Sequence, residues 1–363
     1  MSMTSYSIHP DIAQAETLPG SFYQDQTTFD ALREKVFYKT WQWIGDEAMV
    51  QLPKQVHPFV LLDGFLTEPM VLSKDENGEI HCLSNVCTHR GNLVVQNPGN
   101  QRKMICMYHG RKFGLNGAFE SMPEFKRAVN FPRACDDLHR FEIAQWGPLL
   151  FANMGSTNEF QQIIDEMNTY VGFLPLKEFV YNEVQSKEYL VNGHWALYCD
   201  NYLEGFHIPF VHQDLNQALD YGSYETLLHE HFNVQVGYTE GAEDIFDLPS
   251  DHIHAGKRIA AYYFWVFPNM MFNFYPWGLS INIVRPLSLN QTKVSFLSYV
   301  YDASKLHTGA GALLDKVERE DEFVVEGVHK GLRSRYYSTG RFSPTREKGV
   351  HQFHRMLAEA LGK

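Results

Sequence analysis

The sequence predicts an α+β fold in which a small all-β domain precedes a larger domain of antiparallel sheet and helices. From residue 42 to about 155, short apolar runs alternate with Gly, Pro, Asn and Asp, a pattern typical of short strands joined by loops. Beyond that point, longer β-rich runs are mixed with segments of helical periodicity. A chain of 363 residues is long enough for two domains with separate cores. We therefore expect an N-terminal segment with a helix over 1–41, a β domain over 42–155 and an α+β domain over 156–363.

The individual elements follow from local patterns. Phe29, Leu32 and Val36 recur at helical spacing, which predicts an amphipathic helix over 28–41. In the β domain, the apolar runs that predict strands are 59–62, 70–72, 80–83 and 149–151. In the third segment, strands are expected at 189–191, 262–266, 270–274, 281–284 and 294–301, and helices at 159–170, 195–207 and 309–332.

Composition argues against several classes of protein. With 31 Lys+Arg against 43 Asp+Glu, the formal net charge is −12, which disfavours non-specific nucleic-acid binding. There is no run of 18 or more apolar residues, so no membrane span is expected. The first twenty residues lack the basic start and apolar centre of a signal peptide. Five cysteines, an odd number, indicate a reducing compartment, and we expect the cytoplasm.

Two compact pairs of possible metal ligands lie in the β domain. Cys87 and His89 form the first pair, and after sixteen intervening residues Cys106 and His109 form the second. A [2Fe–2S] cluster with one Cys₂ iron and one His₂ iron requires this ligand set. A Cys₂His₂ zinc site uses the same residue types, but its familiar spacing places both Cys before both His. Chance proximity of ordinary core residues is the remaining alternative.

The stretches NVCTHRGNLV and CMYHGRKFGLNG resemble the cluster-binding loops of Rieske-type ring-hydroxylating oxygenases. High-potential Rieske proteins carry an extra Cys in each loop, whereas this chain has Asn92 and Met107 in that neighbourhood. The resemblance covers essentially the whole chain and implies a Rieske domain followed by a helix-grip (START-like) catalytic domain. Cys82, Cys135 and Cys199 are then left over and are expected to be small buried hydrophobic residues.

A second constellation, DNYLEGFHIPFVH, contains His207 and His212. Residues five apart on a continuous helix lie on different faces, but Pro209 is expected to disrupt the helix and let His212 turn back. Two His ligands with one carboxylate and open positions form the facial triad of Fe(II) oxygenases. Helix-capping or core histidines are the alternative.

The carboxylate is expected from the helix 309–332. Asp321 lies in the middle of its apolar stripe, with Glu318 as second choice near the border, whereas Glu320 and Glu322 are assigned to a solvated face. The stripe consists of Leu314, Val317, Val324, Val325, Val328 and Leu332.

The resemblance also implies a role for Glu204, three residues before His207. In the family, an acid at this place bridges the mononuclear iron to a Rieske His of the neighbouring subunit in a head-to-tail homotrimer. Carried over, Glu204 would contact His109 of another chain. Many relatives have Asp here, and Glu matches the carnitine monooxygenase pattern.

The resemblance implies a terminal oxygenase that uses O₂ and NAD(P)H-derived electrons to oxidise a small organic substrate. No G-x-G-x-x-G fingerprint is present, so a separate reductase or ferredoxin is expected as the electron donor. The alternative from another class is an electron carrier with a ligand-binding domain, which would hold two irons per chain instead of three.

A quaternary ammonium or methylated amine is the favoured substrate, and an aromatic ring or aromatic acid is the runner-up. Aromatic residues of the third segment could form a cation-binding box, although core packing is the plainer interpretation. They are Tyr262, Tyr263, Phe264, Trp265, Phe272, Phe274, Tyr275 and Trp277.

Basic residues near the cluster loops predict a docking patch for an acidic reductase on this acidic chain. Arg102 and Lys103 lie in a polar turn, whereas Arg90 and Arg111 could instead brace the loops. Further basic residues nearby are Lys112, Lys126 and Arg127.

Overall fold

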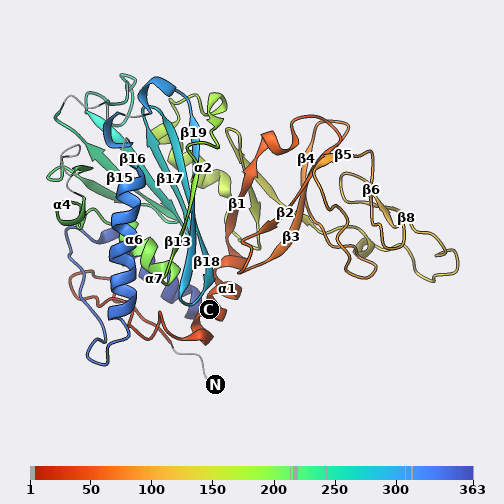
Figure 1. Ribbon diagram of the computed structural model, residues 1–363, viewed down its shortest axis with the longest axis horizontal. Helices are drawn as coiled ribbons and strands as arrows, with labels where there is room; N and C mark the ends of the chain where they lie inside the picture. Colours follow the sequence, from red (N-terminus) through yellow and green to blue (C-terminus); the bar gives the residue numbers. More distant parts are fainter. Residues whose placement is uncertain are drawn as a thin grey trace. The chain divides into compact units, whose positions relative to one another are not determined.

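The computed structural model describes residues 5–212, 214–215, 220–241, 244–306, 308–311 and 314–362. The chain forms two compact units (Figure 1). The smaller is Trp41–Thr157, and the larger combines Met1–Thr40 with Asn158–Lys363. The N-terminal segment is thus part of the larger unit, where its helix contacts the C-terminal helix. The predicted α+β class is confirmed.

The smaller unit is built from three antiparallel sheets. Its strands are β1 (Trp41–Asp46), β2 (Gln55–Leu61), β3 (Glu68–Lys74), β4 (Ile80–Ser84), β5 (Gly99–Asn100), β6 (Met104–Ile105), β7 (Lys112–Phe113), β8 (Phe119–Ser121), β9 (Arg140–Phe141), β10 (Ile143–Trp146) and β11 (Leu149–Asn153). The sheet orders are β5-β2-β3-β4-β9, β1-β11-β10 and β6-β7-β8. The four apolar runs predicted as strands lie in or at the ends of β2, β3, β4 and β11.

The larger unit contains one antiparallel sheet of eight strands. They are β12 (Val180–Tyr181), β13 (Lys187–Val191), β14 (Glu225–Leu228), β15 (Phe232–Tyr238), β16 (Ile259–Val266), β17 (Met270–Tyr275), β18 (Gly278–Ser288) and β19 (Gln291–Val300). The order is β12-β19-β18-β17-β16-β15-β14, and β13 also pairs with β19. The central strand β17 is buried along its whole length, which explains its run of Met, Phe and Tyr. The sequence prediction missed β12, β14 and β15.

Helices cover this sheet. They are α1 (Gln26–Lys35), α2 (Phe160–Val171), α3 (Trp195–Tyr202), α4 (Ile208–Val211), α6 (Leu314–Gly331) and α7 (Lys348–Gly362). Short 3₁₀ turns occur at Phe37–Lys39, Glu47–Val50, Ala134–Asp136, Leu176–Glu178, Ala303–Lys305 and Gly309–Gly311. α3 and α6 contact each other, and they touch β18 and β13 respectively. None of the helices described is long and apolar enough to cross a membrane.

Three of the helix predictions need correction. The helix expected over 309–332 is α6 from Leu314 onward, Gly309–Gly311 form a separate 3₁₀ turn, and residues 312–313 lie outside the described residues. The helix expected over 28–41 is α1, which begins at Gln26, where Asp25 caps it by accepting hydrogen bonds from the backbone of Thr27 and Thr28, and ends at Lys35. The helix expected over 195–207 ends at Tyr202. α7 was not predicted.

Candidate metal centres and an adjoining cavity

A break between two helices positions the paired histidines. α3 ends at Tyr202, a turn follows, and α4 begins at Ile208. His207 therefore precedes α4 and His212 follows it, and their rings meet edge to face with centroids 5.0 Å apart. The expectation that Pro209 breaks the helix is wrong. Pro209 lies in the first turn of α4, where a missing backbone N–H costs little.

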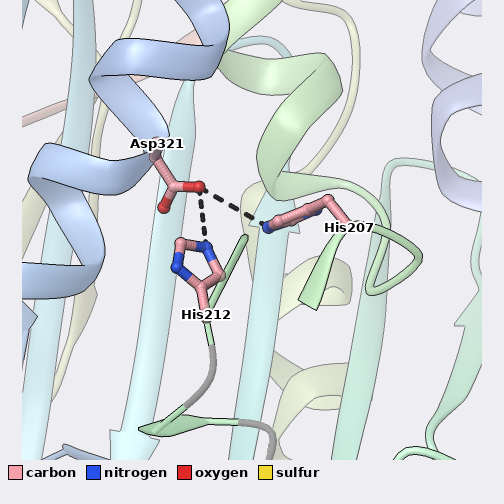
Figure 2. Close-up of side chains that lie close together, drawn as sticks. All are labelled: His207, His212 and Asp321. Carbon is pink, nitrogen blue, oxygen red and sulfur yellow. Dashed lines mark hydrogen bonds and ion pairs between the residues drawn. The ribbon is translucent and has the colours of Figure 1, made fainter. Parts of the chain in front are cut away.

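The two histidines converge on one carboxylate of α6 (Figure 2). The Nε2 atom of His212 lies 2.9 Å from Oδ1 of Asp321, and Nε2 of His207 lies 3.5 Å from the same oxygen. Three ligands bound to one face of an octahedral metal at about 2.1 Å would be roughly 3 Å apart. The two nitrogens and one oxygen thus fit a mononuclear iron. Glu318, the second-choice ligand, does not join this group.

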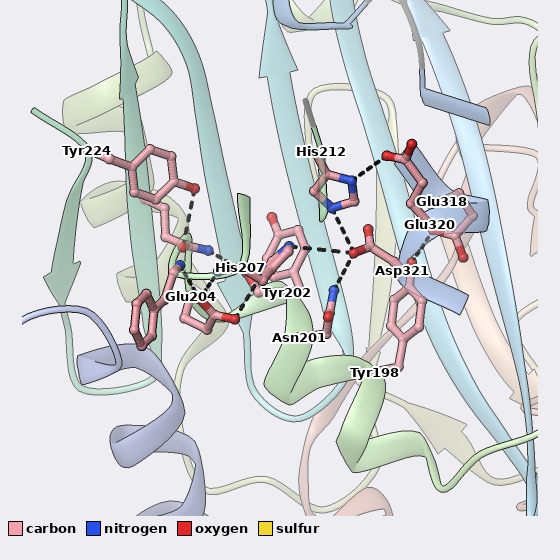
Figure 3. Close-up of polar contacts among 12 residues, drawn as sticks. Tyr198, Asn201, Tyr202, Glu204, His207, His212, Tyr224, Glu318, Glu320 and Asp321 are labelled. Atoms are coloured by element: carbon pink, nitrogen blue, oxygen red, sulfur yellow. Dashed lines mark hydrogen bonds and ion pairs between the residues drawn. The ribbon is translucent and has the colours of Figure 1, made fainter. Parts of the chain in front are cut away.

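The outer nitrogen of each imidazole is held by a glutamate (Figure 3). Nδ1 of His207 lies 2.7 Å from Glu204, and Nδ1 of His212 lies 2.7 Å from Glu320. Such carboxylates fix the ring orientation and leave Nε2 free for a metal. The assignment of Glu320 to a purely solvated face is wrong. The sequence offered no signal for this contact, because 108 positions separate the two residues.

Asp321 has a further partner on α3. The side-chain amide of Asn201 donates a 2.6 Å hydrogen bond to Oδ1 of Asp321. Burial alone would lower the pKa of His212, but the hydrogen bonds and charges of Asp321 and Glu320 outweigh it and raise that pKa. The group therefore attracts positive charge, as a cation site should.

A cavity of about 100 Å³ adjoins these residues. Its floor is one face of the sheet, where register places Gln235, Tyr263, Asn273 and Ser280 side by side on four neighbouring strands. The first three of these line the cavity itself. Aromatic side chains form much of the remaining wall, namely Tyr198, Tyr202, Tyr224, Tyr275 and Phe296.

Core packing, the plainer interpretation of the eight aromatic residues, holds for most of them. Of the eight, Tyr263 and Tyr275 line this cavity and Trp277 lines a neighbouring one. Side chains alternate between the faces of a strand, so adjacent aromatic residues cannot all reach one pocket. The five that line neither cavity are buried, namely Tyr262, Phe264, Trp265, Phe272 and Phe274.

In the smaller unit, the two predicted cluster loops have the same backbone pattern. The amide of Cys87 donates to the carbonyl of Asn92, and that of Cys106 donates to the carbonyl of Arg111. Gly91 and Gly110 each donate back to the carbonyl of the Cys four residues earlier. The backbone φ angles of Gly91 and Gly110 are +74° and +73°, a conformation that few other residues adopt.

The cysteine and histidine side chains of these loops differ in burial. Cys87 and Cys106 are buried, whereas the ring of His109 is exposed and meets that of His89 edge to face, with centroids 4.8 Å apart. A Rieske cluster, with Cys on one iron and His on the other, fits this separation. A single zinc ion fits less well, because it needs ligand atoms that converge on one point and those of the two loops do not. Within the described ranges, three or more ligand atoms converge only at His207, His212 and Asp321 and at a turn with Asp75, Glu79 and His81.

Arg111 braces these loops. It is 2% exposed and forms a 2.7 Å ion pair with Asp136, whose pKa it lowers through that hydrogen bond. The hydroxyl of Thr88 donates to the backbone of the same Asp136. Arg111 is thus no part of an exposed basic patch. The expectation of a buried Cys135 is also wrong, because that thiol is exposed.

Comparison with known proteins gives matches over both units. The family described as "Ring hydroxylating alpha subunit (catalytic domain)" matches residues 180–363, and the "Rieske [2Fe-2S] domain" family matches residues 40–132.

Individual proteins match almost end to end. The chloroplastic choline monooxygenase of Arabidopsis thaliana is 30% identical over 99% of this chain and 86% of its own. The carnitine monooxygenase oxygenase subunit of Escherichia coli (strain K12) is 24% identical over 96% and 94%. A solved quaternary ammonium Rieske monooxygenase, described with carnitine oxidation and inter-subunit electron transfer, has a TM-score of 0.78 at 20% identity, covering 98% of this chain and 100% of that one. The similarity to this solved structure, at 20% identity, concerns the fold alone.

Proposed function

This chain belongs to the family of ring-hydroxylating oxygenase α-subunits, and from that premise we propose that it oxidises a small quaternary ammonium compound or a related methylated amine. The enzyme is a Rieske non-haem iron oxygenase with a [2Fe–2S] cluster and a mononuclear iron. When bound, the cluster supplies electrons singly and the iron activates O₂ for oxidation of the substrate. Family membership decides against the electron-carrier alternative.

We assign the cofactors to the two groups of ligands described above. His207, His212 and Asp321 hold the iron, and the cluster ligands are Cys87, His89, Cys106 and His109. In this assignment, Glu204 and Glu320 keep both imidazoles oriented through Nδ1, so that Nε2 faces the metal. Asn201 holds the Asp321 carboxylate in place.

The cavity beside the iron ligands carries the substrate proposal. Its aromatic wall, including Tyr202, Tyr263 and Tyr275, suits a quaternary ammonium group, which binds to the faces of aromatic rings. The names of the choline and carnitine relatives support the same chemistry. An arene would also stack on these rings, because the amide side chains of Gln235 and Asn273 on the floor are already hydrogen-bonded to Tyr202 and Tyr224. The preference for a quaternary ammonium group over an arene therefore rests on the relatives, and the substrate panel separates the two classes.

A separate NAD(P)H-dependent reductase or ferredoxin supplies the electrons in this proposal, and three chains form a homotrimer. Glu204 then lies on the electron path to His109 of a neighbouring chain. Met107 and Tyr108 beside His109 are 80% and 52% exposed, which suits a surface that another chain covers. No disulfide joins the five cysteines, two of which are assigned to the cluster, and this is in keeping with the cytoplasmic location that we propose.

A substrate panel tests the proposed function. The purified chain, with a reductase, is offered methylated amines and aromatic acids, and substrate-dependent NADH consumption is measured together with formaldehyde and hydroxylated products. We expect turnover with a trimethylammonium compound. Turnover confined to aromatic acids would replace the proposal with its runner-up. Iron content should be three per chain.

A further inference from the structure

One carboxyl group in the cavity wall has no counter-charge among the residues that the structure describes. Glu318 on α6 is 2% exposed, and its Oε2 accepts a 2.6 Å hydrogen bond from the hydroxyl of Tyr198 (Figure 3). Its Oε1 is buried and has no hydrogen-bond partner among the described residues. A buried carboxylate is costly unless a cation or further hydrogen bonds compensate it.

The other carboxylates of the cavity are already occupied. Glu204 is paired with His207, and Asp321 contacts both histidines and Asn201. No Lys or Arg is found among the described residues that line this cavity. The charges that act most strongly on Glu318 are those of Asp321, Glu322 and Asp315, and all three are negative. A bound cation could provide the positive charge that these residues do not provide.

The position of Glu318 fits that role. It precedes Asp321 by three residues on α6, so the two side chains lie on the same helical face, with Cβ atoms roughly 5–6 Å apart. Tyr202, Tyr263 and Tyr275 line the same cavity, and aromatic rings attract cations to their faces. A quaternary nitrogen in this space would be adjacent to the iron ligands.

We propose that Glu318 is the counter-ion that selects a cationic substrate, a specificity-determining residue that acts by charge and not by ligating the metal. This inference rests on the proposed function and deepens it. Burial raises the pKa of Glu318 well above its usual range, and a cation beside the group favours the charged form. A neutral ligand of the same shape lacks this attraction.

Choline and its neutral isostere 3,3-dimethylbutan-1-ol, in which carbon replaces the charged nitrogen, test the proposal. Their dissociation constants are measured by calorimetry on the holoenzyme and on Glu318→Gln, a change that removes the charge but keeps an acceptor for Tyr198. We expect the wild type to prefer choline by at least about tenfold, in line with an ion pair of low exposure. Glu318→Gln should lose most of that preference and bind the isostere as before.

Two further variants separate charge from structure. Tyr198→Phe removes the hydrogen bond yet leaves the carboxyl group, and should keep the preference for choline. Glu322→Gln is the matched control, one turn further along α6 and outside the cavity lining, and should also keep it. Melting temperature and iron content show whether each variant is folded and loaded.

The outcomes are distinguishable. If Glu318→Gln still prefers choline, the assignment of Glu318 fails and the proposed function stands. If the wild type itself does not distinguish the two probes, the quaternary ammonium class fails. If Glu318→Gln does not fold, Glu318→Asp is tested in its place. A folded Glu318→Asp variant that retains the charge but loses the preference for choline overturns the assignment.

Discussion

Each imidazole of the His207–His212 pair is held at Nδ1, by Glu204 and Glu320 respectively. Both Nε2 atoms point toward Oδ1 of Asp321. Rings constrained in this way are oriented before a metal arrives, so little conformational freedom is lost on binding. The site thus depends on single side chains from α6 and from the segment around α4.

Replacing His207, His212 or Asp321 by Ala should abolish oxygenation and leave the visible absorption of the Rieske cluster intact. Loss of a residue that merely supports a ligand costs roughly 10–100-fold in metal affinity, and loss of a ligand should cost more. Iron content is expected to fall from three to two per chain. Loss of the Rieske spectrum in Asp321→Ala would show that the site is misplaced.

Glu204→Gln separates orientation from electron transfer. The amide can still accept from Nδ1 of His207 at the present 2.7 Å, so both metals should be retained. We expect the chemically reduced cluster to be no longer reoxidised by O₂ in a single turnover with substrate, because the charged bridge is lost. Reoxidation at the wild-type rate would remove Glu204 from the electron path.

At the scale of elements, the start of α3 contacts the N-terminal segment within the larger unit. His194 caps α3, accepting a 3.2 Å hydrogen bond from the backbone of Ala196 at Nδ1. Its buried ring lies edge to face against Phe22, Tyr23 and Phe29, with centroids 5.8, 5.4 and 5.8 Å away. A proton on Nδ1 would break the cap, so the folded state requires the neutral ring.

Stability should therefore fall as pH drops below about 6.5. Burial, with a smaller effect from His329, lowers the pKa of His194 to about 3. The unfolded chain binds this proton at its ordinary pKa near 6.5 and the folded chain does not. Between these values, stability should decrease by at most about 1.4 kcal/mol per pH unit from this group.

The His194→Asn variant checks this, since Asn retains the capping acceptor and does not titrate. Melting temperatures are compared from pH 7 to pH 5, and the decrease should be shallower in the variant than in the wild type. Parallel curves would mean that His194 does not control acid stability.

At the scale of the whole molecule, charge is distributed unevenly. The chain carries a formal charge of −12, yet Arg90, Arg102, Lys112, Lys126 and Arg127 of the smaller unit are basic and face solvent at least in part. Lys103 is exposed but paired with Glu120 at 2.5 Å. With Arg111 buried, this smaller set of basic residues is what an acidic reductase would meet.

Reductase-coupled turnover should fall steeply with ionic strength, because the Debye length shrinks from about 10 Å at 0.1 M salt to about 3 Å at 1 M. Arg102→Glu combined with Lys103→Glu should raise the Michaelis constant for reductase and leave chemically reduced single turnover unchanged. Lys177→Glu with Lys330→Glu, on the larger unit, is the matched control. It should leave both the Michaelis constant for reductase and the single turnover unchanged. Normal reductase kinetics at low salt in the first variant would place the docking surface elsewhere.

The sequence by itself determined the α+β class and the family, because both depend on local patterns. Within each ligand pair of the cluster loops, the Cys and the His are two or three residues apart, and apolar periodicity distinguishes strands from helices. The same periodicity singled out Asp321 on α6, whose carboxylate the structure brings to the paired histidines.

Only the tertiary structure decided which residues surround the site. Glu320 reaches His212 and Glu318 reaches Tyr198 across more than 100 positions of sequence, and no local pattern records such contacts. The cavity wall depends likewise on strand register, which sends Tyr263 into the cavity and its neighbour Tyr262 to the other face. The physical reason is the same in each case. Spacing along the chain sets what a segment can form, whereas burial and charge are properties of the neighbours that folding brings together.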